Sequence, residues 1–165
     1  MSAGLWSVSV TAASLGSGVV GGVLYGFSAF VMRGLDATRP GTAVAAMQEM
    51  NRAAPRAPLT VPLLGTALLC VLLTVRAASD VRGGDNSTQA WWVLAGCALY
   101  LLVIVITGAY HVPRNDRLNL LDPSAADMDG TWRHYVSGWL AWNHARTAAA
   151  VGASVAFVLG LGASA

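Results

Sequence analysis

The three histidines of this chain, His111, His134 and His144, all lie in its second half. Neutral imidazole is a general base near physiological pH and a common metal ligand. His111 ends one apolar stretch and His144 lies inside another, and an ionisable group within such a stretch is a functional-site candidate. His134 lies in a polar connection, which favours a solvated side chain.

Arg146 follows His144 by two residues and lies deeper in the same apolar stretch. Burying an arginine in hydrocarbon is costly, so its side chain either reaches back to the membrane interface or binds a partner. The planar guanidinium suits a carboxylate, enolate or phenolate oxygen. Asp116, Glu49 and an anionic ligand are the partners that we consider.

Aromatic residues follow a helical period beside this arginine. At about 100° per residue, one stripe contains Trp132, Tyr135, Trp139, Trp142 and Arg146, with Asn143 at its edge. The stripe predicts either helix packing or a platform for a flat ligand. His144 points well away from Trp139, so both face one narrow pocket only if the helix begins with a distortion.

A metal site is an alternative use of the same side chains. His111 and His144 with Asp116 or Glu49 would supply ligands, although no His-x-x-x-His or Glu-x-x-His pair stands on one helix. Cys70 and Cys97 lie in apolar runs without zinc spacing, which indicates small buried side chains. Haem or a transition metal bound by His111 and His144 therefore remains a second interpretation.

Membrane helices must position these residues. Of the 165 residues, 55% are hydrophobic and only 11% are charged, whereas a soluble domain has about 25% charged residues. A helix crosses the hydrocarbon core with roughly 20 apolar residues, and four stretches approach or exceed that length: about 5–32, 59–75, 90–110 and 138–161. We predict an all-α fold in which residues 1–165 form a single membrane domain, an integral membrane four-helix bundle.

The connections between these spans differ in character. Thr42 to Arg52 alternates apolar and polar residues as a short amphipathic helix does, which predicts an interfacial helix or one that folds back over the bundle. Residues 76–89 read as a loop, and 111–136 as the most polar connection. The N-terminal stretch lacks the basic region of a cleavable signal, so we expect the first span to remain in the mature protein.

The arginines predict an orientation. The first and third connections hold Arg33, Arg39, Arg52, Arg56, Arg114, Arg117 and Arg133, and the opposite side holds Arg76 and Arg82. The positive-inside rule therefore places connections one and three in the cytoplasm and both termini outside, in what we expect to be a bacterial inner membrane. A net charge of +2 without a basic run argues against a nucleic-acid partner, so lipid is the expected surroundings.

Gly18, Gly22 and Gly26 are spaced four residues apart in the first span. This spacing places small residues on one helix face, where another helix backbone can approach closely. The partner helix belongs either to the same chain or to another protomer, so a homo-oligomer through this glycine seam is one outcome.

Four segments resemble the anthrone oxygenase-like family of small membrane proteins. They are Phe27–Met32, Met47–Arg52, His111–Asp116 and Trp139–Thr147, and the last, with its Trp-x-x-Trp-Asn-His-x-Arg-Thr pattern, is the most specific. The resemblance spans nearly the whole chain. It implies a four-helix membrane protein and a monooxygenase that converts an anthrone-type polyketide into the anthraquinone. Position 111 is His here, where the family more often has Asn.

From these residues we expect an oxidoreductase for a small apolar aromatic substrate and dioxygen. His144 or His111 would be the base, and Arg146 and Asn143 would stabilise the oxyanion. The substrate-binding residues would be Trp139, Trp142, Asn51, Asn115 and Asp116. This route requires no cofactor.

Two other interpretations remain open. The first keeps the oxidation but adds the haem or metal held by His111 and His144. The second is a non-enzymatic membrane subunit or scaffold that packs through its glycine seam. A transporter is less favoured, because the chain lacks an inverted repeat and a charged midplane.

Overall fold

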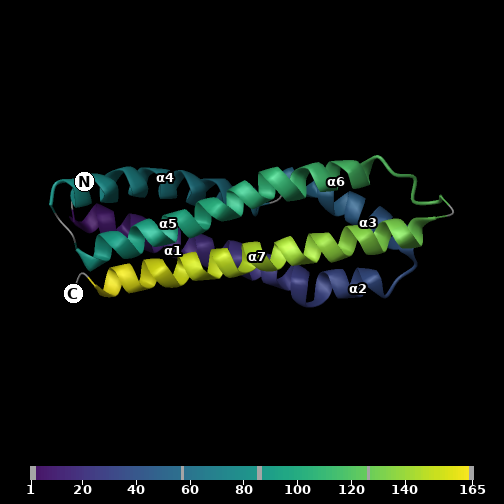
Figure 1. The fold of residues 1–165 in the computed structure, drawn as a ribbon, viewed down its shortest axis with the longest axis horizontal. Coiled ribbons are helices and arrows are strands. Elements are labelled where there is room, and N and C mark those ends of the chain that lie inside the picture. Colours follow the sequence, from purple (N-terminus) through teal and green to yellow (C-terminus); the bar gives the residue numbers. More distant parts are fainter. Residues whose placement is uncertain (1–2, 57, 85–86, 126, 164–165) are drawn as a thin grey trace.

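A computed structural model describes residues 3–56, 58–84, 87–125 and 127–163 of the chain. Within them every regular element is a helix, and the helices run side by side along one axis (Figure 1). Four continuous helical stretches are long and apolar enough to cross a membrane: Gly4–Asp36, Thr60–Arg82, Thr88–Asn119 and Met128–Gly162. The predicted four-helix membrane bundle is confirmed.

Two of these stretches contain a π-helical turn. The first consists of α1 (Ala3–Gly26), the turn Phe27–Val31 and α2 (Met32–Asp36); the third consists of α5 (Thr88–Ile106), the turn Thr107–His111 and α6 (Val112–Asn119). The second is α4 (Thr60–Arg82) and the fourth is α7 (Met128–Gly162). Between the first two stretches lie α3 (Pro40–Ala53) and a short 3-10 turn, Ala54–Arg56.

The helices extend beyond the apolar stretches that predict them. The expected loop at 76–89 is helical as far as Arg82, and Arg76 pairs with Asp80 one turn later at 3.0 Å. The third helix continues past His111 to Asn119, and α7 begins at Met128, ten residues before the expected span. Hydropathy marks only the part of a helix that lies in hydrocarbon, whereas polar turns continue the same helix into water.

The helix α3 confirms the predicted amphipathic segment and shows where it lies. Its buried face includes Val44, Met47 and Gln48, and the Gln48 side-chain amide donates to the carbonyl oxygens of Leu118 and Leu121 at 2.9 Å each. These carbonyls lie at and just beyond the C-terminal end of α6, where backbone acceptors lack the hydrogen bonds of a continuing helix. The helix α3 is therefore folded back over the bundle and fastened to α6.

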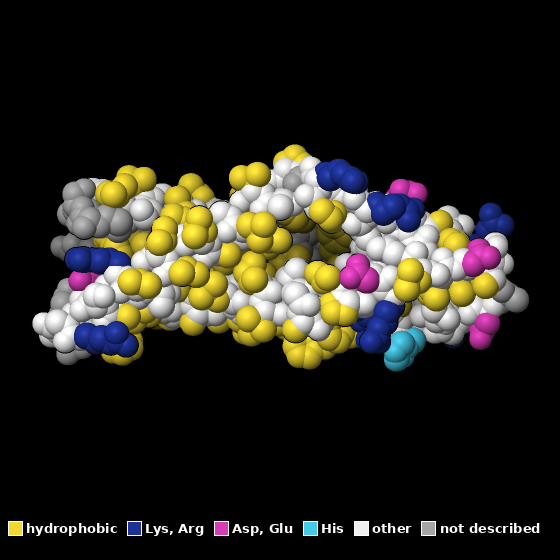
Figure 2. All heavy atoms as spheres, turned by 90° about the horizontal axis from the view of Figure 1, so that it is seen from above, with side chains coloured by type: hydrophobic (Ala, Val, Ile, Leu, Met, Phe, Trp, Pro, Cys, Tyr) yellow, Lys and Arg dark blue, Asp and Glu magenta, His cyan; other side chains and the backbone are white. Residues whose placement is uncertain are grey.

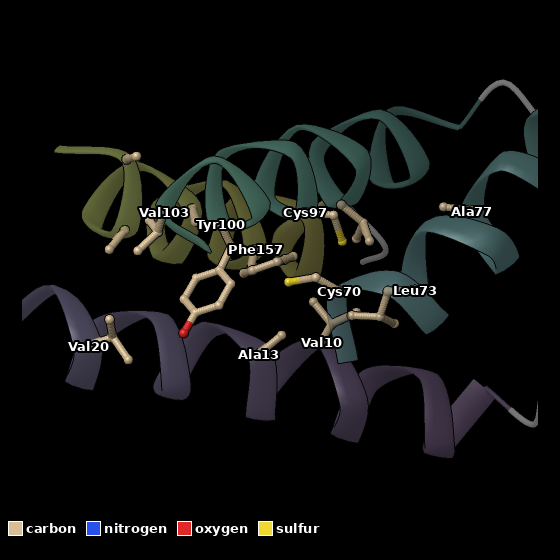
Figure 3. Packing of buried hydrophobic residues seen from close by; sticks show 14 of the residues in the cluster. Val10, Ala13, Val20, Cys70, Leu73, Ala77, Cys97, Tyr100, Val103 and Phe157 are labelled. Carbon is tan, nitrogen blue, oxygen red and sulfur yellow. The ribbon is translucent and has the colours of Figure 1, made fainter. Parts of the chain in front are cut away.

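Two hydrophobic clusters follow one another along the molecule. The bundle cluster joins α1, α4, α5 and α7, and Figure 3 shows Val10, Cys70, Tyr100 and Phe157 meeting at its centre. The cap cluster joins α2, α3, α6 and the first turns of α7 and comprises Met32, Ala43, Val44, Met47, Leu118, Trp132, Tyr135, Val136 and Trp139. Both chain termini lie at the end of the molecule opposite the cap (Figure 1).

Close helix approach within the chain occurs at glycines outside the predicted seam. A Cβ at Gly21 would meet Val151 at 3.1 Å, and one at Gly16 would overlap Thr66 of α4. At Gly22, by contrast, a Cβ would meet nothing within 4 Å, and Gly18 would only reach Ser154 at 3.4 Å. The seam of Gly18, Gly22 and Gly26 thus does not form the tight contacts of the bundle, and its use between protomers remains a prediction.

Candidate functional site

A cavity of about 300 Å³ lies where the cap cluster meets the bundle cluster. Val20, Leu24 and Val103 line it from the bundle, and Met47 and Trp139 line it from the cap. Figure 2 shows a hollow with hydrophobic walls on the face of the molecule seen there, with most of the charged side chains of this face on one side of the hollow and a few at the far end of the molecule. A mostly apolar cavity of this size that also holds a few polar groups is typical of a small-molecule site.

Arg146 of α7 is one of the polar groups in the cavity wall, and only 7% of it is exposed. Its Nη1 donates to the Thr107 hydroxyl at 3.1 Å, and its Nη2 donates to Asn143 Oδ1 at 2.7 Å. Its Nε has no hydrogen-bond partner. Among the described residues no carboxylate lies within ion-pair distance of this guanidinium, so it is a buried cation without a protein counter-ion.

Asn143 orients this arginine and does not line the cavity itself. The side chain is fully buried, and its Nδ2 donates to the Leu24 carbonyl oxygen at 2.8 Å and to Ser28 Oγ at 2.7 Å. Both donor hydrogens are thus used on the first helical stretch, and Oδ1 is left to accept from Arg146. Asn143 therefore contacts Arg146 and not the cavity, whereas we expected it to contact an oxyanion directly.

His111 is the second ionisable group in the cavity wall, with 2% of it exposed. Neither nitrogen of its ring has a hydrogen-bond partner among the described residues. The ring packs edge-on against Trp139, with 5.1 Å between ring centroids, and against Tyr110 at 5.4 Å. Packing against aromatic rings therefore holds the imidazole, and its nitrogens have no hydrogen-bond partner among the described residues.

Trp139 brings these two groups together. The carbon of the Arg146 guanidinium lies 5.8 Å from the centre of its ring, on the scale of a cation–π contact. Phe27 packs against the same indole at 5.8 Å, and the indole nitrogen is buried without a partner. The cavity therefore presents an aromatic surface flanked by a fixed positive charge and an imidazole.

Amide side chains and a carboxylate occupy the part of the cavity nearest the cap. Asn51, Asn115, Asp116 and Asn119 all line it there. Asn115 Oδ1 accepts from the Tyr135 hydroxyl at 2.8 Å, and Asn51 Nδ2 donates to Asn119 Oδ1 at 3.3 Å. Three of the predicted substrate-binding residues, Asn51, Asn115 and Asp116, thus line the same part of the cavity.

Both π-helical turns lie at the level of the cavity. Phe27 begins the first turn, Thr107 begins the second and His111 ends it, and all three line the cavity. A π-helical turn accommodates an extra residue in a helix and is often found at functional sites. Here it places Thr107, which anchors Arg146, and His111 on the same wall.

Other predicted site residues lie elsewhere. His144 is exposed on the outer surface of α7 and His134 is exposed near its start. Trp142 is 44% exposed and packs on Tyr110 at 5.1 Å, outside the cavity wall. The buried face of α7 instead runs through Trp132, Tyr135, Trp139, Asn143 and Arg146, so the stripe includes Asn143 where we expected Trp142.

Glu49, a predicted partner for Arg146, is also outside the cavity. It forms an exposed ion pair with Arg52, one turn along α3. The hydrogen bond from the Arg52 guanidinium holds the pKa of this carboxyl below its usual value. Its negative charge is thus engaged at the surface, and the buried guanidinium of Arg146 remains uncompensated.

Thr107, Tyr135 and Asn119 contribute to the site although sequence reasoning did not select them. The spacing carried one signal: Thr107, His111, Asn115 and Asn119 recur every fourth residue and so share one helix face. Tyr135 was assigned to the aromatic stripe, but nothing in its spacing indicated that its hydroxyl contacts Asn115.

The residues proposed as metal ligands do not converge. His111 faces the cavity, whereas His144 is exposed on another face of α7. Across the described parts of the chain, no three or more His, Cys, Asp or Glu side chains lie together as a metal site requires. The donor set therefore does not fit a haem or metal held by His111 and His144.

These features define a four-span membrane protein with a capped, aromatic-lined cavity that contains a buried arginine and an uncommitted histidine. A family model described as anthrone oxygenase matches residues 2–156, nearly the whole chain. The chain belongs to the anthrone oxygenase family. No curated protein and no solved structure matches it.

Proposed function

We propose that this protein is a membrane monooxygenase that oxidises a flat, apolar, anthrone-like polyketide with dioxygen, using His111 as the base and Arg146 as the oxyanion site. Membership of the anthrone oxygenase family supports an oxygenase role. The observation that carries the proposal is that a buried guanidinium without a counter-ion and an imidazole without a hydrogen-bond partner both pack against Trp139.

The chemistry begins with removal of a proton from the carbon opposite the substrate carbonyl. His111 takes this proton, and the electron pair delocalises onto the carbonyl oxygen. Arg146 stabilises the resulting oxyanion, because its guanidinium is already fixed by Thr107 and Asn143 and needs little reorganisation. The low-dielectric surroundings strengthen this attraction.

Dioxygen then accepts the electrons of the carbanion. A carbon–oxygen bond forms, and the new peroxide takes the proton from His111 to give a hydroperoxide. His111 removes the remaining hydrogen from that carbon, the carbonyl double bond forms and the oxygen–oxygen bond breaks. The departing hydroxide takes the proton back from His111 as water, so one molecule of dioxygen yields one quinone and one water and restores the base.

The substrate supplies all the electrons in this route, which therefore proceeds without a cofactor. A ligated haem or metal is the weaker candidate, because His111 and His144 do not meet. No observation favours the scaffold role over a catalytic role, whereas a cavity with two uncommitted ionisable groups supports catalysis.

Anthrone oxidation by the purified protein in lipid nanodiscs tests the proposal. With ¹⁸O₂, we expect one labelled oxygen in each anthraquinone and one in water, with equimolar consumption of anthrone and dioxygen. The rate must exceed that of empty nanodiscs, because anthrone also oxidises slowly in base. A rate equal to that background, or label absent from the quinone, would exclude this activity.

A further inference from the structure

One wall of the cavity is a polar ladder, by which we mean Thr107, His111, Asn115 and Asn119. These residues recur every fourth position from the second π-helical turn to the end of α6, and all four line the cavity. At a rise of about 1.5 Å per residue, successive side chains are roughly 6 Å apart along the axis. The ladder therefore extends from the Arg146 anchor to the amide-lined part of the cavity.

Asn115, the third residue of the ladder, can offer a ligand only part of its side-chain amide. The side-chain oxygen of Asn115, Oδ1, accepts a hydrogen bond from the Tyr135 hydroxyl at 2.8 Å. Tyr135 is itself 5% exposed and packs in the cap cluster. The Asn115 amide is thereby fixed with its N–H₂ group as the part left for the cavity.

We propose that Asn115 is a specificity-determining residue that binds a second oxygen of the substrate, two rungs along the ladder from Thr107, which anchors Arg146, and that Tyr135 positions it. The ligand class is a planar aromatic molecule with oxygen atoms at two separated positions on its edge. This inference rests on the proposed function for the oxygen at Arg146. It adds a second recognition point that the reaction itself does not require.

The same observations argue against a merely structural role for Asn115. A side chain needed only to satisfy Tyr135 would use its oxygen and leave its N–H₂ to solvent or backbone, yet Asn115 is half-buried and lines the cavity. The neighbouring Asn119 uses its oxygen in the same way, to accept from Asn51. In both asparagines the side-chain oxygen is engaged, which leaves the N–H₂ group as the donor available to the cavity.

A matched ligand pair tests the inference without any turnover. The probes are 2-naphthol, with one oxygen, and 2,6-dihydroxynaphthalene, with an oxygen at each end of the same ring system. Binding to the protein in nanodiscs is followed by tryptophan fluorescence, since Trp139 lies in the cavity wall. For the wild type we expect five- to tenfold tighter binding of the diol, about the effect of one additional hydrogen bond.

The variants N115L and Y135F separate recognition from folding. N115L should remove the preference for the diol and leave 2-naphthol binding within about twofold, and Y135F should reduce the preference because the amide can then turn. The control R117Q changes an exposed residue of the same helix and should keep the preference. Equal weakening of both ligands by N115L, a preference that survives it, or no preference in the wild type would overturn the inference.

The result is independent of the oxidation assay. A wild-type preference for the diol without anthrone turnover would leave the second recognition point standing and remove the proposed activity. Turnover of anthrone without such a preference would do the reverse.

Discussion

Arg146 and His111 place opposite demands on one small cavity. A guanidinium buried without a counter-ion favours an anionic ligand, whereas an imidazole can accept a proton only while it is neutral. A substrate that is neutral when it enters and anionic after it loses a proton meets both demands. The two residues are therefore matched to the change in charge that the proposed reaction produces.

Replacing Arg146 by lysine should impair catalysis although the charge is kept. Two guanidinium nitrogens are held at once by Thr107 and Asn143, and a single ammonium group lacks this fork geometry. We expect the turnover rate for anthrone to fall roughly 100-fold, the effect of losing one oxyanion donor. The exposed R117K on α6 is the control, and an R146K enzyme with more than half the wild-type turnover would contradict this role.

Replacing Asn143 by leucine should destabilise the protein. The change keeps the number and branching of the side-chain heavy atoms but leaves Arg146 Nη2 and the Ser28 hydroxyl without the partner they have now. A buried polar group that loses its partner costs about 1–3 kcal/mol, which thermal unfolding in detergent can measure. H144L, one residue along on the exposed face, should leave the unfolding temperature unchanged; an equal loss in both variants would show that Asn143 has no special role.

At the scale of the elements, two adjacent glycines have different surroundings. Gly21 faces Val151 and Ala150 of α7, and Gly22 faces no atom within 4 Å. The contact between α1 and α7 is close because residues such as Gly21, Ala150 and Ala153 are small, as in many membrane helix pairs.

The variants G21L and G22L should therefore behave differently. The leucine side chain of G21L would push α1 away from α7, so we expect a lower unfolding temperature and loss of activity. G22L should unfold at the same temperature as the wild type. Its mass in detergent tests the glycine seam: if the wild type is an oligomer and G22L is a monomer, the seam lies between protomers. A G22L protein that is unfolded, with G21L intact, would contradict the packing described here.

The elements also show what the sequence could predict. Four apolar stretches and the amphipathic pattern of Thr42–Arg52 were enough for the bundle and α3. Arg146, His111 and Asn115 were recognisable as polar residues next to apolar runs. His144 could reach the cavity only through a distortion of the helix, and α7 is a continuous α-helix from Met128 to Gly162. The contact of the Tyr135 hydroxyl was missed because its partner is 20 residues away.

At the scale of the whole molecule, the cavity lies at the junction between the membrane bundle and a polar cap. The α7 helix alone spans 35 residues, about 52 Å at 1.5 Å per residue, whereas the hydrocarbon core is about 30 Å thick. One end of the molecule must therefore stand out of the membrane, and the arginine count predicts that the cap is the cytoplasmic end. An apolar substrate would then reach the cavity from the membrane interface.

Cysteine labelling tests this orientation in intact bacterial cells. R39C lies at the start of α3 in the cap, and R82C ends α4 at the opposite end; Cys70 and Cys97 are buried and should not react. We expect a membrane-impermeant maleimide to label R82C from outside and R39C only after the cells are opened. The reverse pattern would place the cap outside.

The central claim, that His111 is the base in the capped cavity, is tested most directly by one pair of variants in the nanodisc assay. H111F removes the buried imidazole and H144F removes an exposed imidazole of α7. We predict that H111F lowers anthrone oxidation at least 100-fold, toward the rate of empty nanodiscs, and that H144F stays within about twofold of wild type. Loss of activity in H144F with retention in H111F would contradict the account.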